Sequence, residues 1–129
     1  MLKNKEYLIE TDIFVKHLKH RGKGYSTLEL AMSSGLCFTT VLNASELIDA
    51  VKTENERNTV ISLLSAVKIL GLHQRYSLYV NEFSEKVVSI RDSLFCVVAK
   101  INKLVILTDD IRKYKRTGLK IISSRDLRG

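Results

Sequence analysis

The chain has 129 residues, 45% of them hydrophobic and 27% charged, and carries a net charge of +7 at pH 7. This length suits one globular domain with a buried core, and this composition is normal for a soluble domain and does not favour a disordered chain. No apolar run approaches the roughly 20 residues that span a bilayer, and no signal-peptide core follows the charged start. We therefore expect a single domain over residues 1–129, in the cytoplasm and away from membranes.

The positive charge favours a polyanionic partner, of which nucleic acid is the commonest large one, although many basic domains bind none. Lysines and arginines are concentrated in the last third of the chain, between Lys100 and Arg128, with a second group at positions 16–23. Cys37 and Cys96 show no paired spacing. We expect them to be reduced, buried thiols and neither a disulfide nor part of a zinc site.

Short apolar strands alternate with amphipathic helices along the chain. Strands are expected at 7–9, 36–40, 104–107 and 119–122, with a further short one left open at 71–76. Helices are expected from a cap at Thr11 or Asp12 to about 19, from a Ser26–Glu29 capping box to 33, and at 41–51, 55–70, 77–88, 92–102 and 109–115. This alternation predicts a three-layer α/β/α sandwich around a central, mainly parallel sheet of four to five short strands.

Acidic residues fall where predicted strands end and helices begin. Glu10 ends the first strand, and Glu46 lies one turn into the helix after the second. Asp92 opens the helix before the strand at 104–107, and Asp109 and Asp110 follow that strand. Parallel sheets place their working sites at the carboxyl ends of the strands, so these carboxylates should converge. Close like charges destabilise a fold unless a cation binds them, and Mg²⁺ or Mn²⁺, which can drive phosphodiester hydrolysis, prefers such oxygens.

Each acid also has a simpler structural interpretation. Asp92 could be a helix N-cap or first-turn acid, and Asp109 and Asp110 could cap the short helix that follows them. Glu46 could be one more exposed helical acid. Glu10, at the end of an apolar strand, is the hardest to explain without a site, so the prediction depends on several acids at matching points of the topology.

Two other pairs of residues have both a functional and a structural interpretation. His17 and His20 have a spacing that can bind zinc, but their lysine and arginine neighbours favour a solvated helix face. Tyr76 and Tyr79 could stack on nucleic-acid bases, but their helical spacing favours a place in the core or at its rim.

Five segments resemble, in order, the motifs of the PIN-domain family and of the VapC toxins within it. The opening strand is followed by Glu10, Thr11 and Asp12, and the second segment, 38–47, contains Glu46. The third, 90–95, places an Asp at a helix start; the fourth, 104–110, is a strand followed by Thr-x-Asp; and the fifth, 118–122, is similar to the closing strand. The similarity covers the whole chain and implies a single PIN-like domain over residues 1–129.

The resemblance also implies a site. Four carboxylates would be catalytic and would bind Mg²⁺ or Mn²⁺: Glu10, Glu46, Asp92 and Asp110. Three supporting residues would lie beside them: Asp12, Thr108 and, at the variable position of Thr-x-Asp, Asp109. The family usually has Asp where this chain has Glu10, and the extra methylene shifts the oxygens by roughly 1 Å. Either the site adjusts, or Asp12 contributes more, or catalysis is weakened.

By the same resemblance, the protein would be a metal-dependent endoribonuclease, the toxin of a toxin–antitoxin pair. It would cut RNA, form a homodimer and be blocked by a cognate antitoxin protein. An alternative, favoured by Glu10, is a PIN-fold module that binds RNA or protein without cleavage. A third is a phosphotransfer receiver or phosphatase, which would need a nucleophilic Asp at the end of the first strand, where this chain has Glu10.

Overall fold

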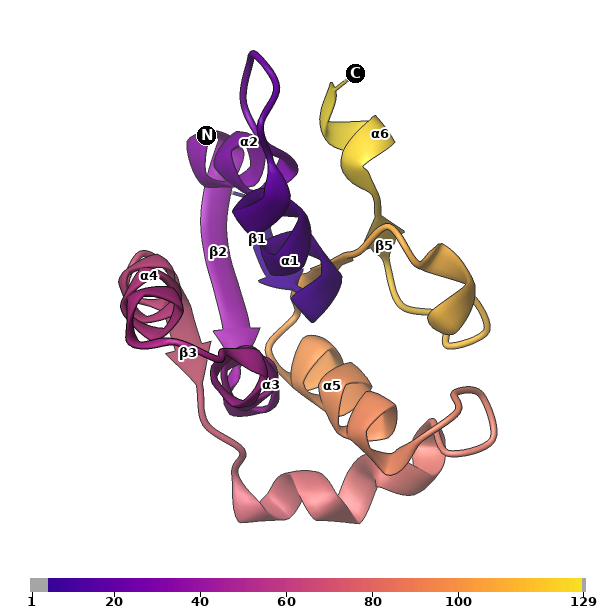
Figure 1. Ribbon diagram of the computed structural model, residues 1–129. Coiled ribbons are helices and arrows are strands. Elements are labelled where there is room, and N and C mark those ends of the chain that lie inside the picture. The colour runs from indigo at the N-terminus through magenta and orange to yellow at the C-terminus, as the bar shows by residue number, and fades with distance from the viewer. Residues whose placement is uncertain (1–4, 129) are drawn as a thin grey trace.

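Five parallel strands form one sheet in the order β3-β2-β1-β4-β5 in the computed structural model, which describes residues 5–128 (Figure 1). The strands are β1 (Lys5–Ile9), β2 (Gly35–Thr40), β3 (Lys68–Leu70), β4 (Val105–Leu107) and β5 (Ile121–Ile122). Every neighbouring pair is parallel, and β1 lies at the centre between β2 and β4. The sheet carries helices on both faces, which confirms the predicted three-layer class.

Helices connect the strands. The α-helices are α1 (Thr11–Lys19), α2 (Thr27–Ser34), α3 (Val41–Ala50), α4 (Glu54–Leu64), α5 (Ile90–Ile101) and α6 (Ser124–Arg128). Two segments form 3-10 helices: η1 (Gln74–Glu82) and η2 (Ile111–Lys113). Within residues 5–128, no helix is long and apolar enough to cross a membrane.

The sheet separates two hydrophobic cores. Successive side chains of a strand point to opposite faces, and in β1 Tyr7 and Ile9 enter one core while Leu8 enters the other. The first core packs α1, α2, α3 and α4 against the sheet, and the second packs α5 and η1. In Figure 1, η1 runs beside α5 on its side of the sheet, and α6 lies beside α2. The near-continuous apolar runs of the sequence reflect strands that are covered on both faces.

The predicted helix at 55–70 is wrong at its C-terminal end. The helix stops at Leu64, and Lys68–Leu70 form β3, which pairs with β2 at the edge of the sheet. The short strand considered at 71–76 therefore lies three residues earlier. Val67 and Leu70 continue the helical spacing of the preceding apolar residues, so the pattern is the same for either structure. Backbone pairing with Phe38 and its neighbours decides for the strand.

Other boundaries also differ from the prediction. The predicted helix at 77–88 is the 3-10 helix η1, which starts at Gln74, and the one at 109–115 shortens to η2. The cap of α1 is Glu10, whose carboxylate accepts from the backbone N–H of Thr11, and neither Thr11 nor Asp12. The capping box of Ser26 and Glu29 is confirmed. Helix α6 was not predicted.

Candidate active site at the carboxyl ends of the strands

The strand order reverses at β1, because β2 and β3 lie on one side of it and β4 and β5 on the other. In open α/β sheets such a switch point leaves a crevice beyond the carboxyl ends of the strands, where ligands bind. Here Ile9 pairs with Leu107, so the next residues of both strands, Glu10 and Thr108, emerge together. A pocket of about 300 Å³ opens at this point. It is lined by Glu10, Thr11, Asp12, Glu46, Arg91, Thr108, Asp110 and Lys113.

Glu10 is the buried floor of this pocket, with only 3% of its surface exposed. Its Oε1 accepts hydrogen bonds from the backbone N–H of Thr11 and from Asn43 Nδ2, both at 2.9 Å. Its Oε2 accepts one from the hydroxyl of Tyr114. Burial alone would raise the pKa of this carboxyl, but the hydrogen bonds and the charge of Arg91, together with Tyr114 and Thr11, lower it to about 2. Glu10 is therefore a permanent negative charge at neutral pH.

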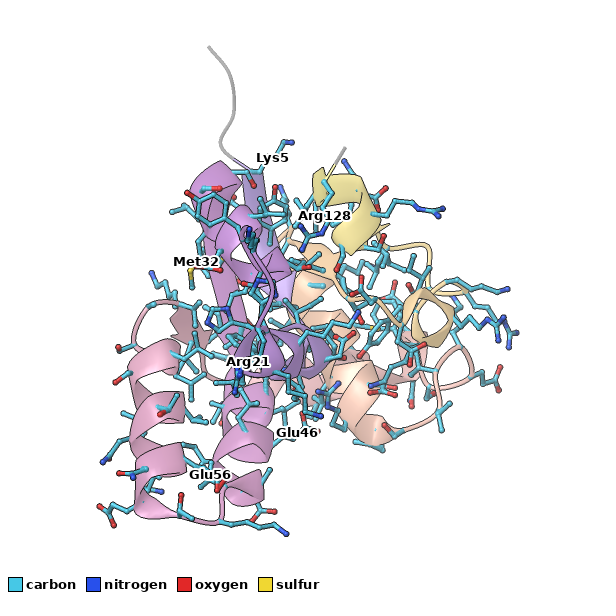
Figure 2. All side chains as sticks on the ribbon, turned by 45° about the horizontal axis from the view of Figure 1, so that its top comes forward. Lys5, Arg21, Met32, Glu46, Glu56 and Arg128 are labelled. Atoms are coloured by element: carbon cyan, nitrogen blue, oxygen red, sulfur yellow. The ribbon has the colours of Figure 1, made fainter. Side chains whose placement is uncertain are left out.

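The guanidinium of Arg91 lies between Glu10 and Glu46. Its Nη2 is 2.6 Å from Glu10 Oε1 and 2.6 Å from Glu46 Oε1. Nη1 donates to Glu10 Oε2 at 2.7 Å, and Nε donates to Glu46 Oε2 at 3.1 Å. Figure 2 shows Glu46 on the side of α3 that faces α5, the helix that carries Arg91. The two carboxylates are thus bridged by one cation from the start of α5.

Asp92 completes this side of the site. It lies in the first turn of α5, whose N-cap is Ser89, so Asp92 is not the cap but is the first-turn acid that the structural interpretation also allowed. Its carboxylate is almost fully buried, and Oδ1 is 3.1 Å from Arg91 Nη1 and 3.3 Å from Lys113 Nζ. Lys113 also lies 3.5 Å from Glu10 Oε2. Two cations therefore compensate three carboxylates.

The opposite wall is built by Asp12 and Thr108. Asp12 accepts from the Thr108 hydroxyl and, at 2.9 Å, from the backbone N–H of Asp109. Burial is the largest influence on the Asp12 carboxyl and raises its pKa. Asp110 is exposed at the mouth of the pocket, and its backbone N–H donates to the Thr108 hydroxyl at 3.1 Å.

Asp109 turns away from the pocket. Its carboxylate accepts from the backbone N–H and the hydroxyl of Ser124, at 2.7 and 2.6 Å, and forms an ion pair with Lys16. Burial would raise its pKa, but these contacts lower it. Asp109 therefore ties β4 to the start of α6 and to α1.

The topology thus brings Glu10, Glu46, Asp92 and Asp110 to one place, as the strand-end argument predicted. Sequence reasoning missed Asn43, Arg91, Lys113 and Tyr114. Arg91 stands directly before Asp92, and a basic residue beside a predicted acidic ligand was the available signal. Asn43 was detectable as the partner of Thr40 in a capping box at the start of α3. The contacts of Lys113 and Tyr114 with Glu10 span more than a hundred positions and left no local pattern.

The types of side chain at this site suit a divalent cation. Carboxylate oxygens are the ligands that Mg²⁺ and Mn²⁺ prefer, and three of the predicted ligands line or border the pocket with a fourth at its mouth. Within residues 5–128, however, no three acidic, histidine or cysteine side chains are arranged to hold an ion as they stand. Oxygens of Glu10 and Glu46 already contact Arg91. Arg91 therefore occupies oxygens that an ion bound to Glu10 and Glu46 would use.

The remaining candidates lie elsewhere. His17 Nδ1 is 2.7 Å from the hydroxyl of Ser26, the cap of α2, which is a structural contact. Tyr76 packs against the second core at its rim, and Tyr79 is about half exposed. Cys37 and Cys96 are free, and burial raises their pKa values to about 11 and about 12. Neither thiol is a nucleophile at neutral pH.

The parallel sheet and the acidic side chains at its switch point place this protein among the open α/β proteins. In that class, ligands bind beyond the carboxyl ends of the strands. A comparison with protein-family models gives the family: the PIN domain model matches residues 7–120, so the chain belongs to the PIN-domain family. Members of this family are generally nucleases that use divalent metal ions. A search of curated proteins finds no significant match.

Solved structures share the fold. VapBC2 from Rickettsia felis, solved with a DNA fragment from its promoter, superposes with a TM-score of 0.74 at 21% identity, covering 92% of this chain and 98% of that one. VapBC-1 from nontypeable Haemophilus influenzae gives 0.76 at 17% identity, covering 93% and 98%. FitAcB from Neisseria gonorrhoeae gives 0.73 at 14% identity, covering 92% and 98%. This confirms the predicted resemblance to VapC proteins at the level of fold.

Proposed function

We propose that this protein is a metal-dependent endoribonuclease that hydrolyses RNA phosphodiester bonds with Mg²⁺ or Mn²⁺. One observation carries the proposal: carboxylates from four separate parts of the chain meet at the switch point between β1 and β4. A bound divalent cation would give such a gathering of like charges a use in phosphodiester hydrolysis. Membership of the PIN-domain family supports the same reaction class.

Each side chain has a role in this proposal. Glu10, Glu46, Asp92 and Asp110 hold the cation, which when bound stabilises the negative charge that develops on the phosphodiester. The burial of Glu10 and Asp92 keeps their oxygens fixed and away from bulk water. The hydrogen bond between Thr108 and Asp12 holds the start of α1 and the segment after β4 in fixed positions relative to each other.

The basic surface supports RNA as the substrate. The chain carries a net charge of +7, and Lys113 reaches the pocket from η2 with 30% of its side chain exposed. An ammonium at this place can contact a backbone phosphate while the neighbouring phosphodiester lies over the carboxylates. Contacts of this kind position the substrate but do not read its sequence.

The proposal extends to partners. Structures with the same fold include toxin–antitoxin complexes, such as one from Klebsiella pneumoniae. We propose that this chain is likewise a toxin, that a cognate antitoxin protein covers its pocket, and that it acts in the cytoplasm as a homodimer. Light scattering of the purified chain tests the dimer, and purification with the product of a neighbouring small gene tests the antitoxin.

Cleavage is tested with a single-stranded RNA labelled at its 5′ end and with a DNA of the same sequence. We expect the parent protein to cut RNA in Mn²⁺ or Mg²⁺ and not in EDTA. Asp92→Asn and Asp110→Asn should each reduce the rate by about 100-fold or more, because each removes a ligand charge without changing the side-chain shape. Asp49→Asn, an exposed acid on α3, is the matched control. Cleavage by Asp92→Asn at the parent's rate would exclude this site.

A second candidate function is RNA or protein binding without cleavage. The observation that favours it is the position of Arg91, whose guanidinium occupies oxygens that a metal would need. A non-cleaving module should bind the RNA, as measured by fluorescence anisotropy, and leave it intact in Mn²⁺. Loss of that binding in Lys113→Gln would place the bound RNA at this pocket.

A further inference from the structure

One arginine contacts three of the acidic side chains of the site. Arg91 makes paired hydrogen bonds to Glu10 through Nη1 and Nη2, and to Glu46 through Nε and Nη2, at distances between 2.6 and 3.1 Å. Nη1 also donates to Asp92 Oδ1 at 3.1 Å. A planar guanidinium has five N–H donors in a fixed fork, and here that fork is shared among three carboxylates.

The length of Glu10 matches this arrangement. An Asp at position 10 would carry its carboxylate roughly 1 Å nearer the backbone, since it lacks one methylene. The longer side chain brings the oxygens within 2.7 Å of Arg91 and into contact with the Tyr114 hydroxyl. The Glu at the end of β1, where the family usually has Asp, and the Arg at the start of α5 therefore form one interaction.

The guanidinium is held but not locked in place. Its carbon lies 5.3 Å from the ring centroid of Phe95, which supports one side of it. The Arg91 side chain is still 21% exposed, and its partner Glu46 is 44% exposed. The pocket of about 300 Å³ that both line gives the guanidinium space to move. A divalent ion placed on Glu10 and Glu46 would repel a guanidinium left on the same oxygens, so both cannot stay.

We propose that Arg91 is a resident counter-cation: it holds Glu10, Glu46 and Asp92 together in the metal-free protein, and a divalent ion binds by displacing it. The proposal deepens the proposed function, since the ion is the one that function requires. Arg91 then competes with the divalent ion for the same carboxylate oxygens. The ion concentration that fills the site is therefore higher than it would be without Arg91. Lys113, whose Nζ lies 3.5 Å from Glu10 Oε2 and 3.3 Å from Asp92 Oδ1, compensates part of the charge in both states.

Titration of Mn²⁺ alone into the full chain, followed by calorimetry, tests this proposal without RNA. We expect Arg91→Gln to bind Mn²⁺ at least about tenfold more tightly than the parent, the size of effect that groups next to metal ligands commonly have. Arg57→Gln, an exposed arginine on α4, removes the same charge away from the site and should leave the affinity unchanged. Equal or weaker affinity in Arg91→Gln would overturn the proposal.

Thermal melting gives a second readout. In EDTA, Arg91→Gln should melt at a lower temperature than the parent, because three carboxylates lose their counter-cation, and Mn²⁺ should raise its melting temperature more than it raises the parent's. Should Arg91→Gln be too unstable to titrate, Arg91→Lys keeps the charge but presents one ammonium in place of the fork, and its Mn²⁺ affinity should exceed the parent's. An Arg91→Lys affinity no higher than the parent's would also overturn the proposal.

The two proposals fail separately. Tighter Mn²⁺ binding by Arg91→Gln, with no RNA cleavage by any variant, would support the counter-cation and contradict the ribonuclease. Metal-dependent cleavage by the parent, with equal Mn²⁺ affinities in the parent and Arg91→Gln, would do the reverse.

Discussion

The hydroxyl of Thr108 donates to both carboxylate oxygens of Asp12, at 3.0 and 3.1 Å, where β1 and β4 end side by side. The same hydroxyl oxygen accepts from the backbone N–H of Asp110 at 3.1 Å. One fully buried side chain therefore joins the first turn of α1 to the loop after β4. It fixes the place from which Asp110 faces the pocket.

Replacing Thr108 by Val should break this junction while keeping the side-chain shape. We expect the free energy of unfolding to fall by about 1–3 kcal/mol, because Asp12 and the Asp110 N–H lose a buried partner. RNA cleavage should fall as well, since Asp110 is no longer fixed. Thr108→Ser retains the hydroxyl and is the control. Urea unfolding measures the stability, and equal stabilities of Thr108→Val and Thr108→Ser would contradict the assigned role.

Asn43 should be a strong determinant of stability. It is fully buried, its Nδ2 donates to Glu10 and to the hydroxyl of Thr11, and its Oδ1 accepts from Thr40. Asn43→Ala removes all of these contacts and should lower the free energy of unfolding by about 2–3 kcal/mol. The exposed Asn55 on α4 gives the matched control, for which Asn55→Ala should change stability by less than about 0.5 kcal/mol.

The metal-free protein should lose stability in acid partly through Glu10. Its pKa is lowered to about 2 in the folded state from 4.5, so its contribution is fully present above pH 4.5 and is lost as the pH falls towards 2. The whole contribution is about 3 kcal/mol, of which about 1 kcal/mol should be gone at pH 3.5. The raised pKa of Asp12 acts in the opposite direction.

Urea unfolding in EDTA between pH 6 and 3.5 measures this effect by comparison with Glu10→Gln, which cannot titrate at that position. The stability difference between the parent and Glu10→Gln should shrink as the pH falls. A difference that stays constant over this range would show that the Glu10 pKa is not lowered.

Ser93 should tolerate a small apolar replacement. Its hydroxyl is buried in α5 and, within the described part of the chain, has no hydrogen-bond partner. Removing an unpaired buried polar atom relieves a desolvation penalty, so Ser93→Ala should leave the stability unchanged or raise it by about 1 kcal/mol. Thr39→Val is the contrast, because the equally buried Thr39 hydroxyl donates to the Ile9 carbonyl and its loss should destabilise the fold. Destabilisation by Ser93→Ala beyond 1 kcal/mol, about the size expected for a lost hydrogen bond, would indicate a partner for the hydroxyl.

The sequence predicted the parts of the site that depend on topology. Strand ends can be read from apolar runs, and parallel strands bring their carboxyl ends together, so Glu10, Asp92 and Asp110 could be grouped from the order of strands and helices alone. The sequence did not show which other side chains lie between these carboxylates. Arg91 reaches Glu10 across 81 positions, and no local pattern indicates which side chains meet at that distance.

The errors in the fold have a similar cause. Residues 68–70 carry apolar side chains at a spacing that suits a helix, and only pairing with β2 makes them a strand. The predicted cap of α1 is one or two residues late, because the sequence marks Glu10 as a site residue and not as a capping residue. In the structure the same carboxylate oxygen of Glu10 accepts hydrogen bonds from the Thr11 N–H and from Arg91.

The pairing of β1 with β4 also constrains biosynthesis. β1 is made first, yet its neighbour on one side is residues 105–107, and Tyr114 and Lys113 reach Glu10 from still later in the chain. Residues up to Tyr114 must therefore have left the ribosome before the acidic pocket can form. A nascent chain that ends before Tyr114 lacks at least one of the groups that contact Glu10, so its acidic pocket is incomplete.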